Sequence, residues 1–438
     1  MVRLGSSQTQ VFEAAEVSPP NQLEQAQAIA PEATPTQATP TQAAKVQENP
    51  VQNSLTQIAK AQASEEQIDV DDIRVTSDHH DRRHQVLQER LKEWDLQVAQ
   101  NPRDLAAWVQ RGITLMKLRQ YDEAIASYNC CLTLNPECCE AWIWRAEVLD
   151  RMGHPEESLQ NWEYASALAP NNPETWNGRG VVLRKLNRLD EALANYNQAL
   201  LLQQTYAKAL NNRGYLHGQR GQWQAALQDF EQAIAAEPDY YQAWKNRGYL
   251  LFALGRNLES LECYDHAVRL RPGQVEAWNG RANVLYNLDR YESALVSYDK
   301  VLTLWPDCPE VWENRGNTLG QLNRYREAIE SYEEALLLKP DLASAAYYRG
   351  VALAHQGKYR KAIESYDWAL QQQPDYADCL YNRASCLALL GELDEALEDL
   401  KTAIDLAPAH REMAQVDADF KRLHGLQLFQ FLIESQAG

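Results

Sequence analysis

The chain has 438 residues, of which 45% are hydrophobic and 24% charged, and its formal net charge is −19. So large an excess of negative charge opposes binding to a nucleic-acid backbone or an anionic membrane surface, and it favours partners with basic or neutral surfaces. No stretch approaches the roughly 18 apolar residues of a membrane span, and the first 20 residues lack the apolar core of a secretion signal, so we expect a reduced, cytoplasmic protein.

Residues 1–77 are rich in Gln, Ala, Pro and Thr, and they contain neither Trp nor Tyr. Such a segment can bury too little apolar area to offset the entropy that the chain would lose on folding. We therefore expect a disordered N-terminal tail.

Residues 78–104 predict a single helix that Pro102 ends, because Leu87, Leu91, Trp94 and Val98 recur at helical spacing. Trp94 lies 34 residues before Tyr128, so it stands where the second helix of a repeat carries its aromatic residue. We expect this helix to form an N-terminal cap.

Residues 105–410 repeat with a constant step of 34 residues. One column holds mostly tryptophan: Trp108, Trp142, Trp176, Leu210, Trp244, Trp278, Trp312, Ala346 and Leu380. Four residues later a second column holds only Gly or Ala, and prolines follow the same step, with Gln204 in the one vacant place. The pattern predicts nine consecutive repeats without an insertion.

Each repeat predicts two helices. In the seventh copy Trp312 and Gly316 mark one face of the first helix, and Tyr332 marks the second, which Pro340 ends. Asn323 stands at the turn between them, in a slot that several other copies fill with glycine, as a left-handed helix end favours.

Residues 411–438 predict a C-terminal capping helix. Ala414, Val416, Phe420 and Leu423 can cover the last repeat, and Gly425 separates a short further element. Solenoids need such terminal caps because each repeat buries its apolar face only against a neighbour.

The pattern W-x2-[RL]-G-x2-L … A-x3-Y-x2-A-x4-P at this period resembles the tetratricopeptide repeat (TPR) and spans 306 of the 438 residues. The sequence of the repeats is similar to that of long bacterial arrays, cyanobacterial ones especially. The resemblance implies an all-α, right-handed superhelical solenoid whose first helices line a concave groove. It also implies protein binding without catalysis. No phosphate loop, GxGxxG, HExxH or GxSxG motif is present, so we expect no cofactor, no metal and no enzyme activity.

The positions that resemble groove-lining ones lie one, two, five, eight and nine residues after the tryptophan column. They give a candidate peptide-binding site of amide and aromatic side chains: Asn177, Asn211, Asn212, Tyr215, Lys245, Asn246, Tyr249, Phe252, Asn279, Asn283, Tyr286, Asn314, Asn317, Tyr348 and Asn382. Amides can bind a peptide backbone, and tyrosines supply rigid contact area. The competing interpretation is that these asparagines only solvate an exposed helix face.

The asparagine run resembles the ladder in the repeats of the O-linked N-acetylglucosamine transferase family, although Gly178, Gly280 and Tyr348 interrupt it. Glycines at 178, 280, 218 and 320 are expected to leave pockets. The family's clamp for chaperone C-terminal tails is not expected, because Lys245 fits its first place while Tyr249 and Gly280 do not fit the next two.

An arginine stands three residues after the tryptophan column in all nine copies, from Arg111 to Arg383. The column could form a basic stripe for an acidic partner. Six copies, however, carry an acid directly after the aromatic residue of the second helix: Glu163, Glu231, Asp265, Asp299, Glu333 and Asp367. We favour an internal ladder of arginine–carboxylate pairs.

Eight cysteines include the close set Cys130, Cys131, Cys138 and Cys139. Tetrahedral zinc sites favour two residues between paired cysteines, whereas adjacent cysteines point apart on a helix. We therefore favour simple substitution at small packed positions over a metal or redox function.

Together these features favour a non-enzymatic scaffold or adaptor that binds a peptide or extended protein segment in its groove. A regulatory or assembly-factor subunit of an enzyme complex remains an alternative that the sequence does not separate from it. An RNA-binding helical array is disfavoured by the negative charge.

Overall fold

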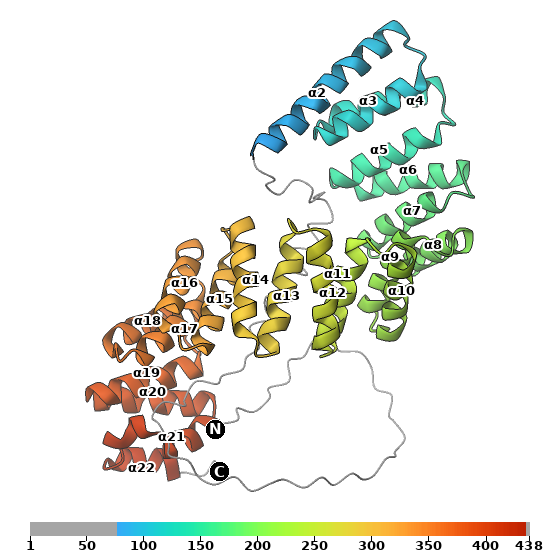
Figure 1. The fold of residues 1–438 in the computed structure, drawn as a ribbon. Coiled ribbons are helices and arrows are strands. Elements are labelled where there is room, and N and C mark those ends of the chain that lie inside the picture. Colours follow the sequence, from blue (N-terminus) through green and yellow to red (C-terminus); the bar gives the residue numbers. More distant parts are fainter. Residues whose placement is uncertain (1–76, 435–438) are drawn as a thin grey trace, which may run out of the picture. The chain divides into compact units, whose positions relative to one another are not determined.

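The computed structural model describes residues 77–434, with side chains from residue 84 onward, so the predicted tail lies outside the described residues. Between 77 and 434 every regular element is a helix (Figure 1). The described chain divides into two compact units, residues 77–311 and 312–434, and each is considered by itself.

The first unit opens with α2 (Ser77–Gln100) and continues as helix pairs. The pairs are α3 (Leu105–Lys117) with α4 (Tyr121–Leu134), α5 (Cys139–Arg151) with α6 (Pro155–Leu168), α7 (Pro173–Lys185) with α8 (Leu189–Leu202), α9 (Ala207–Gln219) with α10 (Trp223–Ala236), α11 (Tyr241–Ala253) with α12 (Asn257–Leu270), and α13 (Val275–Asn287) with α14 (Tyr291–Leu304). Each pair is one 34-residue repeat.

The second unit begins within α15 (Pro309–Gln321), which pairs with α16 (Tyr325–Leu338). It continues with α17 (Ala343–His355) and α18 (Tyr359–Gln372), then α19 (Ala377–Leu390) and α20 (Leu393–Leu406). Three short elements close it: α21 (Ala409–Val416), the 3₁₀ helix η2 (Ala418–Arg422) and α22 (Gln427–Glu434).

The turn inside each repeat has a left-handed residue, as its sequence predicts. Asn323 has φ of 58°, and Gly153, Gly221, Gly255, Gly357 and Gly391 have φ between 70° and 89°. In the remaining repeats Arg119, Asn187 and Asp289 adopt the same conformation. Glycine, and to a smaller degree Asn and Asp, tolerates this conformation, so Arg119 is the least suited of these residues to its place.

The small-residue column allows the two helices of a repeat to approach closely. A Cβ at Gly112 would lie 2.3 Å from the ring of Tyr128, and one at Gly350 would lie 2.5 Å from that of Tyr366. Both tyrosines are fully buried. The aromatic residue of the second helix therefore occupies the space that the glycine leaves.

The expectation that Gly178 and Gly280 leave pockets is wrong. A Cβ at Gly178 would lie 2.4 Å from Trp162, and one at Gly280 would lie 2.3 Å from Tyr264, so aromatic rings of the preceding repeat fill both places. A Cβ at Gly218, by contrast, would meet nothing within 4 Å, and one at Gly320 would meet only the Tyr332 hydroxyl at 3.9 Å.

The tryptophan column joins each first helix to the loop before it. The indole Nε1 of Trp142 donates to the carbonyl of Pro136 at 2.9 Å, and Trp108, Trp176, Trp244 and Trp278 make the same bond to the proline six residues earlier. Where Ala346 replaces the tryptophan, Trp368 of α18 donates to Pro340 instead, at 2.8 Å. The proline carbonyl thus still accepts an indole N–H in this repeat, but the donor lies on the second helix.

The junction of the third and fourth repeats lacks this linkage, because Leu210 has no donor and Gln204 replaces the proline. We predict amide exchange about 5- to 30-fold faster over residues 203–218 than in the seventh repeat, which a loss of 1–2 kcal/mol in local stability would produce. Hydrogen-exchange mass spectrometry measures it. Equal protection of the two segments would contradict the prediction.

Both ends of the described chain are covered. In α2, Val98 is buried and Leu87, Leu91 and Trp94 are half-buried on the side that packs against α3. At the other end Ala414, Phe420 and Leu423 are fully buried, but Val416 is 78% exposed, contrary to expectation. Helix α21 ends at Val416 because the Asp417 carboxylate caps the following 3₁₀ turn by accepting from the Asp419 N–H.

Candidate peptide-binding face

The candidate residues lie on the first helices of the repeats. In the first unit these helices pack side by side, with α9 against α7 and α11 against both α9 and α13. The candidates differ in burial. Asn177, Asn211, Phe252, Asn279 and Asn283 are buried in this unit, and so are Asn314 and Asn317 in the second. Those that remain half-exposed are Asn212, Tyr215, Lys245, Asn246, Tyr249, Tyr286, Tyr348 and Asn382.

Four asparagines form a continuous hydrogen-bonded chain across three helices. Asn246 on α11 donates to Asn211 on α9 at 3.0 Å, and Asn212 on α9 donates to Asn177 on α7 at 3.0 Å. Asn211 in turn donates to Asn212 at 3.4 Å. The amides thus bond to one another between neighbouring repeats, which fixes the register of the helices that carry the face.

Two further asparagines accept hydrogen bonds from core tyrosines. The Tyr298 hydroxyl donates to Asn283 at 2.7 Å, and the Tyr332 hydroxyl donates to Asn317 at 2.8 Å. These bonds satisfy phenol groups that the packing buries. The carbonyl oxygens of both asparagines therefore have a structural role.

A cationic and aromatic cluster occupies the middle of the first unit. Tyr215 and Tyr249 lie near each other on α9 and α11, and burial together with the Tyr215 phenol raises the pKa of Tyr249. The Arg184 guanidinium lies over the Tyr215 ring, 4.9 Å from its centre. Among residues 84–434, Lys245 has no hydrogen-bond or ion-pair partner.

In the second unit the face is aromatic. Asn382 on α19 donates to the Tyr347 hydroxyl on α17 at 2.8 Å. This bond joins two neighbouring first helices as the asparagine bonds of the first unit do, but its acceptor is a phenol. The Tyr347 and Tyr348 rings meet edge to face, 5.0 Å apart.

A charged segment of the same face was not predicted from sequence. Asp150 on α5 accepts from the Lys185 ammonium on α7 at 2.8 Å, and both side chains are largely buried. Glu147 lies one turn earlier on α5, and its burial raises the pKa of its carboxyl. The sequence signal for this segment is the charge of Glu147, Asp150 and Lys185 at groove positions of the second and third repeats.

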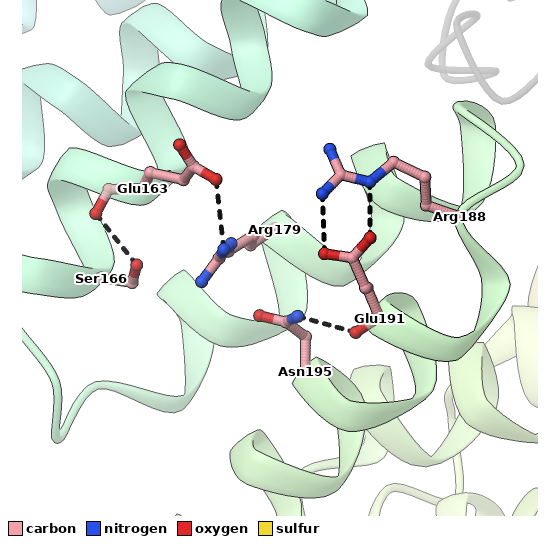
Figure 2. Close-up of polar contacts among 6 residues, drawn as sticks. All are labelled: Glu163, Ser166, Arg179, Arg188, Glu191 and Asn195. Carbon is pink, nitrogen blue, oxygen red and sulfur yellow. Dashed lines mark hydrogen bonds and ion pairs between the residues drawn. The ribbon is translucent and has the colours of Figure 1, made fainter.

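The arginine column forms the internal ladder. Arg179 donates to Glu163 of the preceding repeat at 3.1 Å, as Figure 2 shows, and Arg247, Arg281 and Arg383 pair in the same way with Glu231, Asp265 and Asp367. Figure 2 also shows a second recurrent pair, in which Arg188 at the turn holds both carboxylate oxygens of Glu191.

Several rungs of this ladder also have a partner within their own repeat, which the sequence pattern did not reveal. That partner lies on the second helix, 16 residues after the arginine. It is Ser127 for Arg111, Asp229 for Arg213 and Asp399 for Arg383. The arginines therefore bridge second helices of consecutive repeats, which confirms their structural role for these rungs.

Models of the tetratricopeptide repeat match residues 106–138, 171–237, 211–274, 275–308, 309–342 and 356–411. No curated protein matches the chain. Within the described range no helix combines the length and apolar character that a membrane span requires, and no three potential ligand side chains gather into a metal site.

Similar solved structures include YrrB, described as a TPR protein with an unusual peptide-binding site (24% identity over 43% of this chain and 98% of that chain, TM-score 0.38). The Cut9–Hcn1 hetero-tetramer of the APC/C is 16% identical over 65% of this chain and 56% of that chain, with a TM-score of 0.46. A tetratricopeptide repeat protein from Parabacteroides merdae is 19% identical over 59% and 98%, with a TM-score of 0.39. With repeat models matched along most of residues 106–411, the chain belongs to the tetratricopeptide repeat family.

Proposed function

We propose that this protein is an interaction scaffold that binds an extended segment of a partner protein across α9, α11 and α13. The general role follows from its family, since TPR proteins are interaction modules and generally not enzymes. The observation that carries the finer proposal is the half-exposed cluster of Lys245, Tyr215 and Tyr249, in which the lysine has no partner.

Lys245 is half-exposed on α11, in a chain whose net charge is −19. Its ammonium group can attract a carboxylate of the partner, which gains charge-assisted hydrogen bonds there. The adjacent phenols offer rigid aromatic area that loses little conformational entropy on binding. The asparagine chain supports the proposal because helices already held in register need little ordering when a partner binds.

The test is affinity purification of the whole chain, comparing the natural protein with Tyr249→Ala/Asn246→Ala. We expect the double variant to lose its partner, because the change removes contact area and one link of the amide chain together. Tyr164→Ala is the matched control, since this tyrosine is 58% exposed on the second helix of its repeat. Retention of the same partner by the double variant would refute the proposed face.

A regulatory or assembly-factor role would use the same binding face. It differs only in the identity of the partner, so co-purification of an enzyme subunit with the natural protein, and not with the double variant, would support that role.

A further inference from the structure

The four clustered cysteines do not share one environment. Cys130 is exposed on α4, and the Cys139 thiol donates to the carbonyl of Ala165 at 3.6 Å, toward α6. Cys131 is fully buried at the end of α4. Cys138, which is half-buried, packs against the same apolar cluster that contains Cys131.

A tight turn lies between Cys131 and Cys138. The Asn135 N–H donates to the Cys131 carbonyl at 2.9 Å, and the Cys138 N–H donates to the Asn135 carbonyl at 3.1 Å. These two backbone bonds return the chain from the end of α4 to the start of α5. They bring position 138 back to the apolar cluster around position 131.

Both side chains belong to the same packed group, in which Cys131 is a buried member and Cys138 lies against it. Burial is the main cause, and the neighbouring Cys138 thiol the next, that raises the pKa of Cys131 to about 12. Cys131 therefore stays protonated at neutral pH, and a thiolate is the reactive form of cysteine. Cys138, with its partial exposure, is the member of the pair that an oxidant can reach.

We propose that Cys131 and Cys138 form a redox-active thiol pair, which a peroxide converts into a disulfide across the turn between α4 and α5. The Cys138 thiolate attacks one peroxide oxygen, the O–O bond breaks, and the sulfur becomes a sulfenic acid while the other oxygen leaves as water after protonation. Cys131 then reacts as a thiol, and its sulfur attacks the sulfenic sulfur while its proton passes to the departing hydroxyl group. An S–S bond forms, the S–O bond breaks, and the Cys131 proton and the hydroxide leave as a second water.

A later repeat provides an internal comparison. Cys308 occupies the same slot as Cys138, but Val301 stands where Cys131 would be. The Cys308 thiol instead contacts the Glu310 carboxylate at 3.8 Å. A disulfide within a repeat turn is thus possible at residues 131 and 138 and not at residue 308.

The test uses the full chain with Cys130→Ser/Cys139→Ser, which leaves one thiol on each side of the turn. After treatment with hydrogen peroxide, a glutamate-specific protease cuts after Glu137, between the two cysteines. We expect the two resulting peptides to stay joined with the loss of two hydrogens, and to separate on addition of dithiothreitol. The further change Cys138→Ser should abolish the link, and Cys308→Ser should leave it unchanged.

Two results would overturn the proposal. One is separate peptides, with both thiols still open to alkylation, at a peroxide dose that oxidises the exposed Cys130 of the natural chain. The other is oxidation of residue 138 to sulfinic acid without a link to residue 131, which would mean that the buried thiol does not reach it.

Discussion

Gly280→Ala should lower the stability of the first unit by about 2 kcal/mol, although alanine is the better helix former. The added methyl group would lie 2.3 Å from Cζ of Tyr264. This ring is buried between two repeats, and overpacking of a close-packed interior costs about 1–3 kcal/mol. Urea unfolding followed by circular dichroism, with the exchange of amides in α12 and α13, measures the effect.

Gly218→Ala is the matched control for that substitution. Its methyl group would meet no atom within 4 Å, so only the gain in helix propensity remains, about 0.5–1 kcal/mol. The two substitutions should therefore have opposite signs. A stabilising Gly280→Ala would mean that position 280 is open after all, and that the pocket expected from sequence exists.

Arg213→Met should cost about 2–3 kcal/mol, which is the largest loss that we expect from the arginine column. Arg213 donates to both oxygens of Asp229, at 2.6 and 2.8 Å, and the Asp229 side chain is only 5% exposed. Removing the guanidinium leaves a buried carboxylate without its main partner, and such changes are strongly destabilising. Thermal and urea unfolding of the full chain measures the loss.

Arg111→Met is the comparison, because its acidic partner Asp95 is 48% exposed and water can replace the arginine. Exposed pairs contribute about 0–1 kcal/mol. Neither substitution should change partner binding, since both guanidinium groups bond to second helices. Equal losses for the two variants, or a loss of binding at unchanged stability, would contradict the structural role of the ladder.

The periodic features were predictable from sequence because each depends on one residue type at one place in the repeat. Asn323 at the turn is an example, since its left-handed backbone favours Asn or Gly in any repeat. The arginine ladder was predictable for the same reason. Its acidic partners lie at a fixed offset, 16 residues before the arginine, as in the pair of Arg179 with Glu163.

Contacts between repeats that do not recur at one offset along the array were not predictable in this way. Gly280 suggests a pocket only while its own repeat is considered, because the ring that fills the space belongs to Tyr264 of the repeat before. The asparagines illustrate the same limit. Asn211 and Asn177 occupy groove positions, yet their amides bond to asparagines of neighbouring helices, a use that position alone does not reveal.

The placement of Cys131 and Cys138 against one apolar cluster was not predictable for a different reason. Cysteine spacing along a helix does not show it, because the two residues lie on either side of the turn between α4 and α5. Two backbone hydrogen bonds at Asn135 make residues seven apart neighbours in space.

Site-specific photocrosslinking can show which helices contact the partner. A photoreactive phenylalanine analogue replaces Tyr249 on the proposed face in one version of the full chain, and Tyr164 on a second helix in the other. We predict that a partner protein is crosslinked from position 249 and not from position 164, and that an excess of unmodified protein competes it away. Crosslinking from position 164 alone would place binding on the second helices and would rule out the proposed face.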